Sequence, residues 1–474
     1  MPENLETDIC VIGAGSAGLS VAAGAVQMGA RTVLIEKGRM GGDCLNYGCV
    51  PSKSMLVAGR AARAGRLAAR MGIDYDPPRI DYGKVRLHVQ GVIGAIEPND
   101  SQERFEGLGV TVLRDAARFT GPREVAAGDK LIRARRFVVT TGSRPMVPPI
   151  PGLDRVRYLT NETVFELDVL PRHLIVIGGG PIGCELGQAF RDLGAQVSIV
   201  EMAKIMPKDD PELVDVVRRR LTDHGVKLLE TCKVAGVESS GEGVTAVLER
   251  DGETLRLEGS HLLLAAGRQP NVESLQLESA GVDYDRRGIS TDDRLRTSNP
   301  KIYAAGDVAG GYQFTHMAGH HAGVVIKNAL FRLPGKVERT AVPWVTFTDP
   351  ELAQVGLTES MAREAGLTFK VLRWPFAEND RAQAEHETEG LAKLIVGKGG
   401  KILGAGIVGP AAGELIHPWV LAMANKLKIG AMAQYIAPYP TLGEVSKRAA
   451  GAYYTPKLFS ARTRFLVRAL LKLG

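Results

Sequence analysis

One unit of sequence occurs twice in this chain. Residues 8–18 read DICVIGAGSAG and residues 173–183 read HLIVIGGGPIG, so each copy is an apolar run followed by Gly-x-Gly-x-x-Gly. A second apolar run, GARTVLIE at 29–36 and GAQVSIVE at 194–201, follows each copy and ends in a glutamate. The two copies are offset by 165 residues throughout, and each glutamate lies 18 residues beyond the last glycine. A lone glycine motif is a weak indicator, but this repeated context predicts two strand–helix–strand units.

The two units predict two dinucleotide-binding sites. Glycines let the backbone approach a pyrophosphate closely, and the N-terminus of the following helix supplies N–H donors. The two glutamates would accept hydrogen bonds from the ribose hydroxyls of adenosine. The alternative is a pair of glycine-rich turns without a ligand. The predicted contacts are Gly13, Gly15, Ser16, Gly18, Glu36 and Lys37 in the first unit, and Gly178, Gly180, Pro181, Ile182, Gly183 and Glu201 in the second.

Glu201 also bears on which nicotinamide nucleotide is used. A carboxylate at this strand end suits the 2′-hydroxyl of NADH and repels the 2′-phosphate of NADPH. The next five residues, MAKIM, contain Lys204 but no arginine. The sequence therefore favours NADH over NADPH.

Two of the chain's five cysteines, Cys44 and Cys49, lie close together in GGDCLNYGCVPSK at 41–53. So few cysteines in 474 residues do not indicate an extracellular disulfide framework. Residues 51–70 have a helical pattern, so the pair is predicted at or just before a helix N-terminus, where a thiol pKa falls. A zinc site needs four ligands, and no second CxxC or histidine cluster lies nearby, so no metal site is expected. A redox-active disulfide fits this pair best.

Charge and hydropathy indicate a cytoplasmic protein with one unusual segment. The N-terminus, MPENLETD, has no apolar signal core, and no apolar run reaches the ~18 residues that span a bilayer. Residues 455–474 hold five basic residues and no acid, which leaves the rest of the chain nearly neutral despite a net charge of +6. No nucleic-acid partner is therefore expected. Segment 457–473 has the pattern of a basic amphipathic helix, which would either contact an anionic membrane surface or pack on its own dimer.

The motifs resemble those of a known family. GGDCLNYGCVPSK resembles the active-site signature of class I pyridine nucleotide-disulfide oxidoreductases, the group with lipoamide dehydrogenase, glutathione reductase and mercuric reductase. TTGSRPMVPPIPG (140–152) and AAGRQPN (265–271) resemble the segments bordering that family's nicotinamide domain. TSNPKIYAAGDV (297–308) resembles its second flavin motif, and FTDPELAQVGLTE (347–359) the start of its interface domain.

The resemblance implies an α/β fold with two Rossmann-like dinucleotide-binding domains, for FAD and NAD(P), and an α+β C-terminal dimerisation domain. It also implies a homodimer whose active site is completed across the interface. The expected boundaries are 1–150 for the first part of the FAD domain, 151–270 for the NAD(P) domain, 271–342 for the second FAD part, 343–454 for the dimerisation domain and 455–474 for the tail.

The resemblance also implies roles for individual residues. Cys49 would lie next to the flavin and form the charge-transfer thiolate, and Cys44 would be the outer thiol that attacks the substrate. Lys53 would lie near the flavin's hydride-accepting nitrogen, paired with Glu185. The remaining expected cofactor contacts are Gly42, Asp43, Lys53, Thr141, Gly142, Arg268, Gly306 and Asp307 for FAD, the last at its ribityl chain, and Gly267 for the nicotinamide nucleotide.

The sequence departs from the family's C-terminal motif, His-Pro-Thr-x-x-Glu. This chain reads APYPTLGE at 437–444, with Tyr439 at the histidine position and Glu444 retained. A phenol titrates near ~10, so Tyr439 is a poor base at neutral pH, although it can donate a hydrogen bond to a thiolate. Alternative bases would be His316, His320 and His321, which follow the second flavin motif.

Three functions remain open at this point. The first is an NADH-dependent reductase that passes electrons through FAD and the Cys44–Cys49 disulfide to a small disulfide. The second is a reductase of mercuric or other soft metal ions, because mercuric reductases also carry tyrosine at the position of Tyr439. Those enzymes have a C-terminal cysteine pair, however, and this chain has no cysteine after Cys232. The third is an electron-transfer flavoprotein that works only when docked to a partner.

Overall fold

The first glycine-rich unit forms the centre of a seven-stranded sheet in the computed structural model, which describes residues 3–241 and 243–473. The strand order is β3-β2-β1-β6-β5-β4, and β18 also pairs with β6. The pairs of β1 with β2 and β6, of β2 with β3, and of β6 with β18 are parallel. The strands are β1 (Glu3–Ile12), β2 (Thr32–Ile35), β3 (Thr111–Leu113), β4 (Ala117–Gly121), β5 (Glu124–Ala127), β6 (Lys130–Val139) and β18 (Ile302–Ala304).

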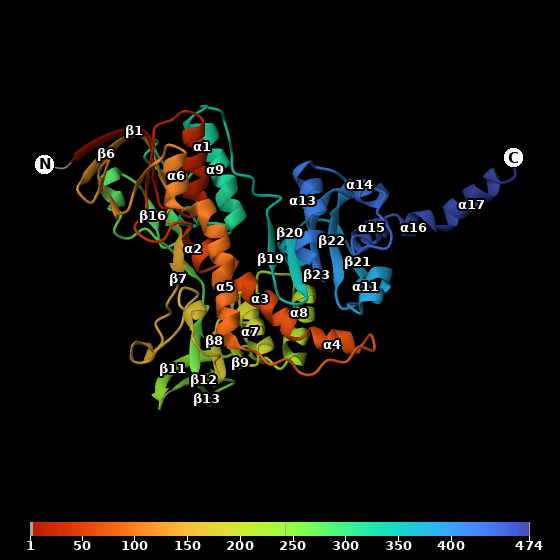
Figure 1. Ribbon diagram of the computed structural model, residues 1–474. Coiled ribbons are helices and arrows are strands. Elements are labelled where there is room, and N and C mark those ends of the chain that lie inside the picture. The colour runs from red at the N-terminus through yellow and green to blue at the C-terminus, as the bar shows by residue number, and fades with distance from the viewer. Residues whose placement is uncertain (1–2, 242, 474) are drawn as a thin grey trace.

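The register of this sheet brings three loops to one edge. Ile12, at the end of β1, pairs with Ile35 of β2 and with Val139 of β6, and Val139 pairs in turn with Ala304 of β18. Because the carboxyl ends of parallel strands meet at one edge, the loops after β1, β6 and β18 lie together. Helices α1 (Ser16–Gln27) and α9 (Thr315–Ala329) pack side by side over this sheet (Figure 1).

The second unit forms a four-stranded parallel sheet of order β10-β9-β8-β14. A three-stranded antiparallel sheet, β11-β12-β13, accompanies it, and the pair β7–β15 joins the two units. The elements are β7 (Ser143–Pro145), β8 (His173–Ile177), α7 (Pro181–Asp192), β9 (Gln196–Val200), α8 (Pro211–Asp223), β10 (Lys227–Leu229), β11 (Lys233–Ser240), β12 (Gly243–Arg250), β13 (Glu253–Gly259), β14 (His261–Leu264) and β15 (Arg268–Pro270).

Residues after 342 form a five-stranded antiparallel sheet of order β19-β20-β23-β22-β21, covered by helices (Figure 1). Together with the mixed sheet of the first unit and the parallel sheet of the second, it confirms the predicted α/β fold of two Rossmann-like units and an α+β unit. Its elements are β19 (Pro343–Thr346), β20 (Glu351–Gly356), α10 (Glu359–Glu364), β21 (Phe369–Pro375), α11 (Asp380–Glu385), β22 (Leu391–Gly397), β23 (Ile402–Gly409), α12 (Ala412–Leu415), α13 (His417–Ala424), α14 (Ile429–Gln434) and α15 (Glu444–Gly451).

The cysteine motif lies on two helices that link the units. Cys44 is in the short helix α2 (Gly42–Asn46), and Cys49 is the first residue of α3 (Cys49–Ala62), as the expected N-terminal position requires. The helical pattern at 51–70 is divided at Arg63, after which α4 (Ala64–Ala69) begins. Helix α3 packs against both α5 (Tyr82–Ile96) and α7, so the cysteine helix contacts the second unit.

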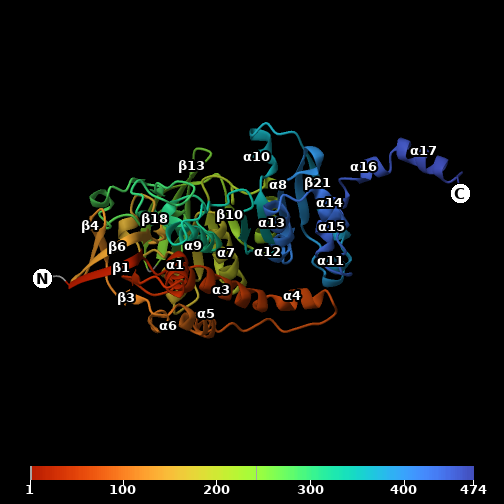
Figure 2. The ribbon, with the colours of Figure 1, turned by 90° about the horizontal axis from the view of Figure 1, so that it is seen from above.

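The C-terminal tail extends away from the rest of the chain in both views (Figures 1 and 2). The expectation of one helix over 457–473 was wrong, because α16 (Thr455–Leu458) ends first and the Ser460 side chain accepts a hydrogen bond from the Thr463 N–H as the cap of α17 (Ala461–Leu470). The tail's large apolar side chains are exposed: Leu458, Phe459, Phe465, Leu466, Val467, Leu470, Leu471 and Leu473. Over residues 3–241 and 243–473, the structure has no helix long and apolar enough to cross a bilayer.

Candidate active site

A cavity of about 750 Å³ lies at the edge where the loops of the first sheet meet. This volume falls within the ~300–1,000 Å³ of ligand and cofactor sites. Its wall brings together most of the residues predicted to bind FAD. Those that line it are Gly13, Gly15, Ser16, Glu36, Lys37, Gly42, Asp43, Lys53, Thr141, Gly142, Arg268, Gly306 and Asp307, together with Cys44, Cys49 and Glu185.

Two glycines of the first motif, Gly13 and Gly18, lie too close to neighbouring backbone to carry a side chain. Gly13 has φ +107°, and a Cβ on it would lie 2.5 Å from the carbonyl oxygen of Thr140. A Cβ on Gly18 would lie 1.8 Å from the carbonyl oxygen of Gly13, so only glycine at this position allows α1 to pack this closely against the loop. Gly15 caps α1 without a side chain, which leaves the first N–H groups of the helix for a ligand. These features fit a dinucleotide pyrophosphate.

The two units form equivalent hydrogen bonds at equivalent positions of the repeated sequence. Glu36 accepts from the N–H groups of Ala14 and Gly38, each at 2.6 Å. Glu201 accepts from the corresponding N–H groups of Gly179, at 2.7 Å, and Ala203, at 2.9 Å. Both carboxylates are therefore held at the strand end by the loops that flank them.

The residues predicted to bind the nicotinamide nucleotide lie partly at the cavity of the first unit and partly at the turn before α7. Ile182 lines the cavity of the first unit. Gly178, with φ +109°, and Gly183 surround the turn before α7, where a Cβ on Gly183 would lie 2.0 Å from the Gly178 carbonyl oxygen. Gly180 caps α7 without a side chain, and Pro181 occupies the first turn. This copy of the motif therefore has the same open helix N-terminus as the first.

Cys44 and Cys49 are brought together as free thiols in hydrogen-bond contact. Cys49 Sγ also lies 3.3 Å from the hydroxyl oxygen of Thr315, the first residue of α9. The hydrogen bond from Cys44 is the largest effect and, with smaller contributions from Thr315 and the charge of Lys53, it lowers the pKa of Cys49 to about 6 against the opposing effect of burial. The same hydrogen bond, together with burial, raises the pKa of Cys44. The pair therefore holds one negative charge near neutral pH, on Cys49.

Lys53 and Glu185 form the predicted ion pair, with Nζ and Oε2 2.6 Å apart. Glu185 is almost fully buried, and its second oxygen accepts a hydrogen bond of 2.8 Å from the Phe347 N–H. The Lys53 ammonium also lies over the Phe347 ring, 4.6 Å from its centroid. Three separate parts of the chain thus fix the position of Lys53 in the cavity wall.

A polar network holds the residues of the second flavin motif. Asp307 accepts a 2.6 Å hydrogen bond from Ser143, whose hydroxyl accepts one of 2.7 Å from Arg268. Arg268 also forms a 3.1 Å ion pair with Asp43, which accepts a hydrogen bond from Asn161. Burial raises the pKa of Asp307, opposed by the hydrogen bond from Ser143 and the charge of Arg268. The network aligns Asp43 and Asp307 along the cavity.

The three alternative histidines are engaged elsewhere. His316 lines the cavity, but its Nε2 lies 2.9 Å from the Pro343 carbonyl oxygen. His320 Nε2 accepts a hydrogen bond from the Glu338 N–H, and His321 Nδ1 accepts one from the Gly306 N–H. Burial lowers the pKa of all three, that of His321 to about 4. His321 therefore supports the flavin-motif backbone and is a poor proton carrier.

Tyr439 and Glu444 lie outside the cavity of their own chain, among the residues that the structure describes. Tyr439 is 70% exposed, and its hydroxyl donates a 2.9 Å hydrogen bond to Asp380. That hydrogen bond raises the pKa of Tyr439. Tyr439 thus remains a protonated hydrogen-bond donor at neutral pH, and it does not line the cavity that contains the cysteine pair.

Motif reading missed several residues of the site. Thr315, Ser143 and Asn161 contact the predicted residues directly, but none stands in a position that the motifs single out. The sequence contains one indication of Thr315, because this residue directly precedes His316, a candidate base after the second flavin motif.

Comparison with known proteins places these observations in a family. Residues 7–322 match the family model for pyridine nucleotide-disulphide oxidoreductases, and residues 342–450 match the model for the dimerisation domain of the same family. A mercuric reductase of Staphylococcus aureus is 36% identical over 446 residues, which cover 94% of this chain and 82% of the relative. A dihydrolipoyl dehydrogenase of Geobacillus stearothermophilus is 34% identical, covering 94% and 96%.

Two solved structures have the same fold along nearly the whole chain. One is the Cu(II) complex of the HOCl-induced flavoprotein disulfide reductase RclA from Escherichia coli, with a TM-score of 0.84, 27% identity and coverage of 93% of this chain and 99% of that one. The other is LpdA from Mycobacterium tuberculosis, with a TM-score of 0.86, 27% identity and coverage of 94% and 99%.

Proposed function

This chain belongs to the FAD-dependent pyridine nucleotide-disulphide oxidoreductases, and we propose that it uses NADH to reduce a small disulfide through the Cys44–Cys49 pair. The observation that carries the proposal is the asymmetry of the two thiols. Cys49 is the more acidic of the two thiols, and both cysteines line the cavity whose residues fit FAD. Bound FAD would supply the two-electron chemistry that connects a hydride donor to a disulfide.

The chain's own residues would handle the thiol chemistry. The proton held by Cys44 can pass to Cys49 through their hydrogen bond, which leaves a nucleophilic thiolate on Cys44. That thiolate attacks a substrate disulfide, forming a mixed disulfide and releasing one thiolate. The first thiolate released takes the proton from Cys49, and the Cys49 thiolate then attacks the Cys44 sulfur, which closes the Cys44–Cys49 disulfide and releases the second thiolate. One disulfide is reduced as another forms, and the two product thiolates take up two protons.

We assign five supporting roles. Lys53, held by Glu185, stabilises negative charge beside Cys49 and the FAD ring. Thr315 donates a hydrogen bond to the Cys49 thiolate. The loops around Gly13 and Gly178 bind the two pyrophosphates, and Glu201 selects NADH over NADPH. Tyr439 of the partner subunit donates a hydrogen bond to the product thiolate, in place of the histidine that would carry a proton.

A soft metal ion is the second candidate substrate. Mercuric reductases are among the relatives, and the RclA structure is described as a Cu(II) complex. Two adjacent thiols, one of them ionised near neutral pH, form a site for a soft cation. The absence of a cysteine after Cys232 means that such an ion would reach the pair without a cysteine relay from the C-terminal segment.

A panel of acceptors tests the proposal. The purified FAD-loaded protein is mixed with NADH and, in turn, with small disulfides, Hg(II), Cu(II) or no acceptor, and NADH consumption is followed at 340 nm. We expect turnover with at least one small disulfide, and loss of that turnover in Cys44→Ser. Turnover with metal ions alone would support the second candidate. Absence of turnover with every small acceptor would contradict both and favour an electron carrier that needs a protein partner.

We also propose that the exposed tail makes a peripheral contact with an anionic surface. Helix α17 projects from the rest of the molecule (Figure 2), and its large apolar side chains are exposed. The segment 455–474 carries five basic residues and no acid. Each Lys or Arg near an anionic membrane contributes ~1 kcal/mol, so the tail would bind reversibly. A second copy of the chain covering α17 is the alternative.

A further inference from the structure

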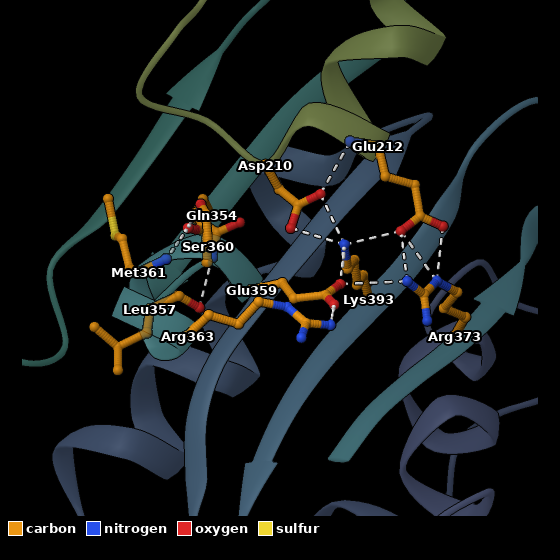
Figure 3. A network of polar contacts seen from close by, with 11 residues as sticks. Asp210, Glu212, Gln354, Leu357, Glu359, Ser360, Met361, Arg363, Arg373 and Lys393 are labelled. Atoms are coloured by element: carbon orange, nitrogen blue, oxygen red, sulfur yellow. Dashed lines mark hydrogen bonds and ion pairs between the residues drawn. The ribbon is translucent and has the colours of Figure 1, made fainter. Parts of the chain in front are cut away.

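A buried lysine joins two distant parts of the chain. Lys393 lies on β22 of the five-stranded sheet, and its side chain is only 5% exposed. Its Nζ contacts the carboxylates of Asp210 at 2.9 Å, Glu212 at 2.8 Å and Glu359 at 2.8 Å (Figure 3). Asp210 and Glu212 belong to the start of α8 in the second dinucleotide unit, so the contact crosses from one unit to another.

Two arginines complete this Lys393 cluster and balance its charge. Arg373 forms a bidentate pair with Glu212, at 2.7 and 2.8 Å, and Arg363 contacts Glu359 at 2.5 Å. The cluster thus has three cations and three carboxylates. Burial alone would lower the pKa of Lys393, but its three carboxylate partners raise it, so the lysine stays charged. Removing one partner of a buried ion pair strongly destabilises the fold, because the other charge is left buried without a partner. The intact cluster therefore holds the two units in a fixed relative position.

The cluster holds one end of the loop that follows Glu201. Asp210 ends that loop and caps α8, because its side chain accepts a 3.0 Å hydrogen bond from the Glu212 N–H. Its neighbour Asp209 is held from the same side, since it accepts a 2.7 Å hydrogen bond from the indole N–H of Trp344 on β19. Lys393, which holds Asp210, and Trp344, which holds Asp209, both belong to the five-stranded sheet unit, which supplies none of the residues of the glycine motif itself.

The other end of the loop lies against the second glycine motif. The Met206 N–H donates a 2.9 Å hydrogen bond to the carbonyl oxygen of Gly179. A Cβ on Gly179 would lie only 2.8 Å from the Ile205 side chain, so the loop is packed tightly onto the motif. Glu201 in turn accepts from the Gly179 N–H. In the first unit's counterpart, the carbonyl oxygens of Met40 and Gly38 accept hydrogen bonds from Asn46 and Arg114 of the same unit.

We propose that Lys393 is a positioning residue for the nicotinamide nucleotide, because it holds loop 201–210 in the place where Glu201 and Gly179 meet the adenosine end of the cofactor. The five-stranded sheet thereby sets the affinity for NADH as well as any dimer contact. Lys393 lies outside the cavity that contains the cysteine pair and does not take part in thiol exchange. The inference rests on the proposed use of NADH.

Two variants test it. Lys393→Met removes the buried charge at similar volume, and Asp210→Asn keeps the helix cap while weakening the pair. We expect both to raise KM for NADH several-fold, and to weaken NAD⁺ binding to the oxidised holoenzyme equally, while kcat at saturating NADH stays near wild type. Hydrogen–deuterium exchange should accelerate at residues 203–209 and remain unchanged at 38–41, the corresponding loop of the first unit.

Arg363→Ala is the matched control, because Arg363 contacts Glu359 but neither Asp210 nor the loop. It should lower Tm slightly and leave KM and exchange unchanged. A lower Tm in Lys393→Met with unaltered KM, NAD⁺ affinity and loop exchange would overturn the inference and leave the cluster a structural one. If Lys393→Met does not fold, the same readouts in Asp210→Asn decide the question. A wild-type protein that binds no nicotinamide nucleotide would overturn the proposed function itself.

Discussion

Cys49 has better partners for a negative charge than Cys44 has. It accepts the hydrogen bond that Cys44 donates, lies 3.3 Å from the Thr315 hydroxyl and is near the Lys53 ammonium. Its position at the first residue of α3 adds the N-terminal end of a helix dipole. These contacts are all local to the cavity, so the acidity of Cys49 belongs to the site and not to the overall charge of the protein.

The acidity of Cys49 predicts a pH dependence. In the two-electron-reduced enzyme, the thiolate form exists above the lowered pKa of about 6 and is lost as the pH falls through that value. The long-wavelength absorbance of a thiolate next to FAD should therefore disappear on acidification with a midpoint near 6. Thr315→Val removes one hydrogen-bond donor and should move the midpoint upward, whereas Thr315→Ser should not. An unchanged midpoint in Thr315→Val would mean that this hydroxyl does not act on Cys49.

The carboxylate of Glu201 predicts a preference for NADH over NADPH. Its carboxylate is fixed by the N–H groups of Gly179 and Ala203, so it cannot easily move away from a 2′-phosphate. We expect NADH to give a higher kcat/KM than NADPH, and Glu201→Ala to narrow that preference by on the order of 1–2 kcal/mol. Steady-state kinetics with both nucleotides provide the measurement. A wild-type preference for NADPH would contradict the assignment.

At the scale of elements, the sequence predicted the strands and helices that are encoded by short segments of the chain. The repeated glycine motifs located β1–α1–β2 and β8–α7–β9, because apolar strands, tight turns and a strand-end glutamate are all encoded within about 30 residues. The family motifs also paired Lys53 with Glu185, 132 residues apart. Thr315 was missed because its contact with Cys49 spans 266 residues and depends on how α9 meets α3. The Lys393 cluster was missed for the same reason.

The exposed helix α17 predicts binding to anionic membranes. Its exposed Phe465 and Leu466 and the tail's five basic residues should bind anionic vesicles at low salt, and the binding should weaken as salt screens the charges. Co-sedimentation of the full chain and of a variant lacking residues 456–474 measures this, with neutral vesicles as the control. If the full chain ignores anionic vesicles and the truncation instead lowers Tm, the tail packs on the protein's own dimer.

At the scale of the whole molecule, we propose that Tyr439 acts at the cysteine pair of a second subunit. Its exposed hydroxyl lies outside the cavity of its own chain, and residues 342–450 match a dimerisation domain. Tyr439→Phe should slow disulfide reduction by about 1.5 kcal/mol, roughly tenfold, because one hydrogen bond to a charged sulfur is lost. Reduction of FAD by NADH should be unaffected, which stopped-flow absorbance can show.

Mixed dimers locate the tyrosine directly. A heterodimer of one Cys44→Ser chain and one Tyr439→Phe chain has one wild-type site only if tyrosine and cysteines come from different subunits. It should then keep half of the wild-type turnover. Half of the turnover of the Tyr439→Phe homodimer would show instead that Tyr439 serves its own chain.

We propose that electrons reach the substrate through a cysteine pair with unequal roles, and an anaerobic titration tests this assignment most directly. The FAD-loaded protein is titrated with dithionite or NADH at pH 7.5 while its visible spectrum is recorded. We predict a long-wavelength band at two-electron reduction in the wild type, its loss in Cys49→Ser, and its retention in Cys44→Ser without acceptor turnover. A band that survives Cys49→Ser and disappears in Cys44→Ser would contradict the assignment of the two sulfurs.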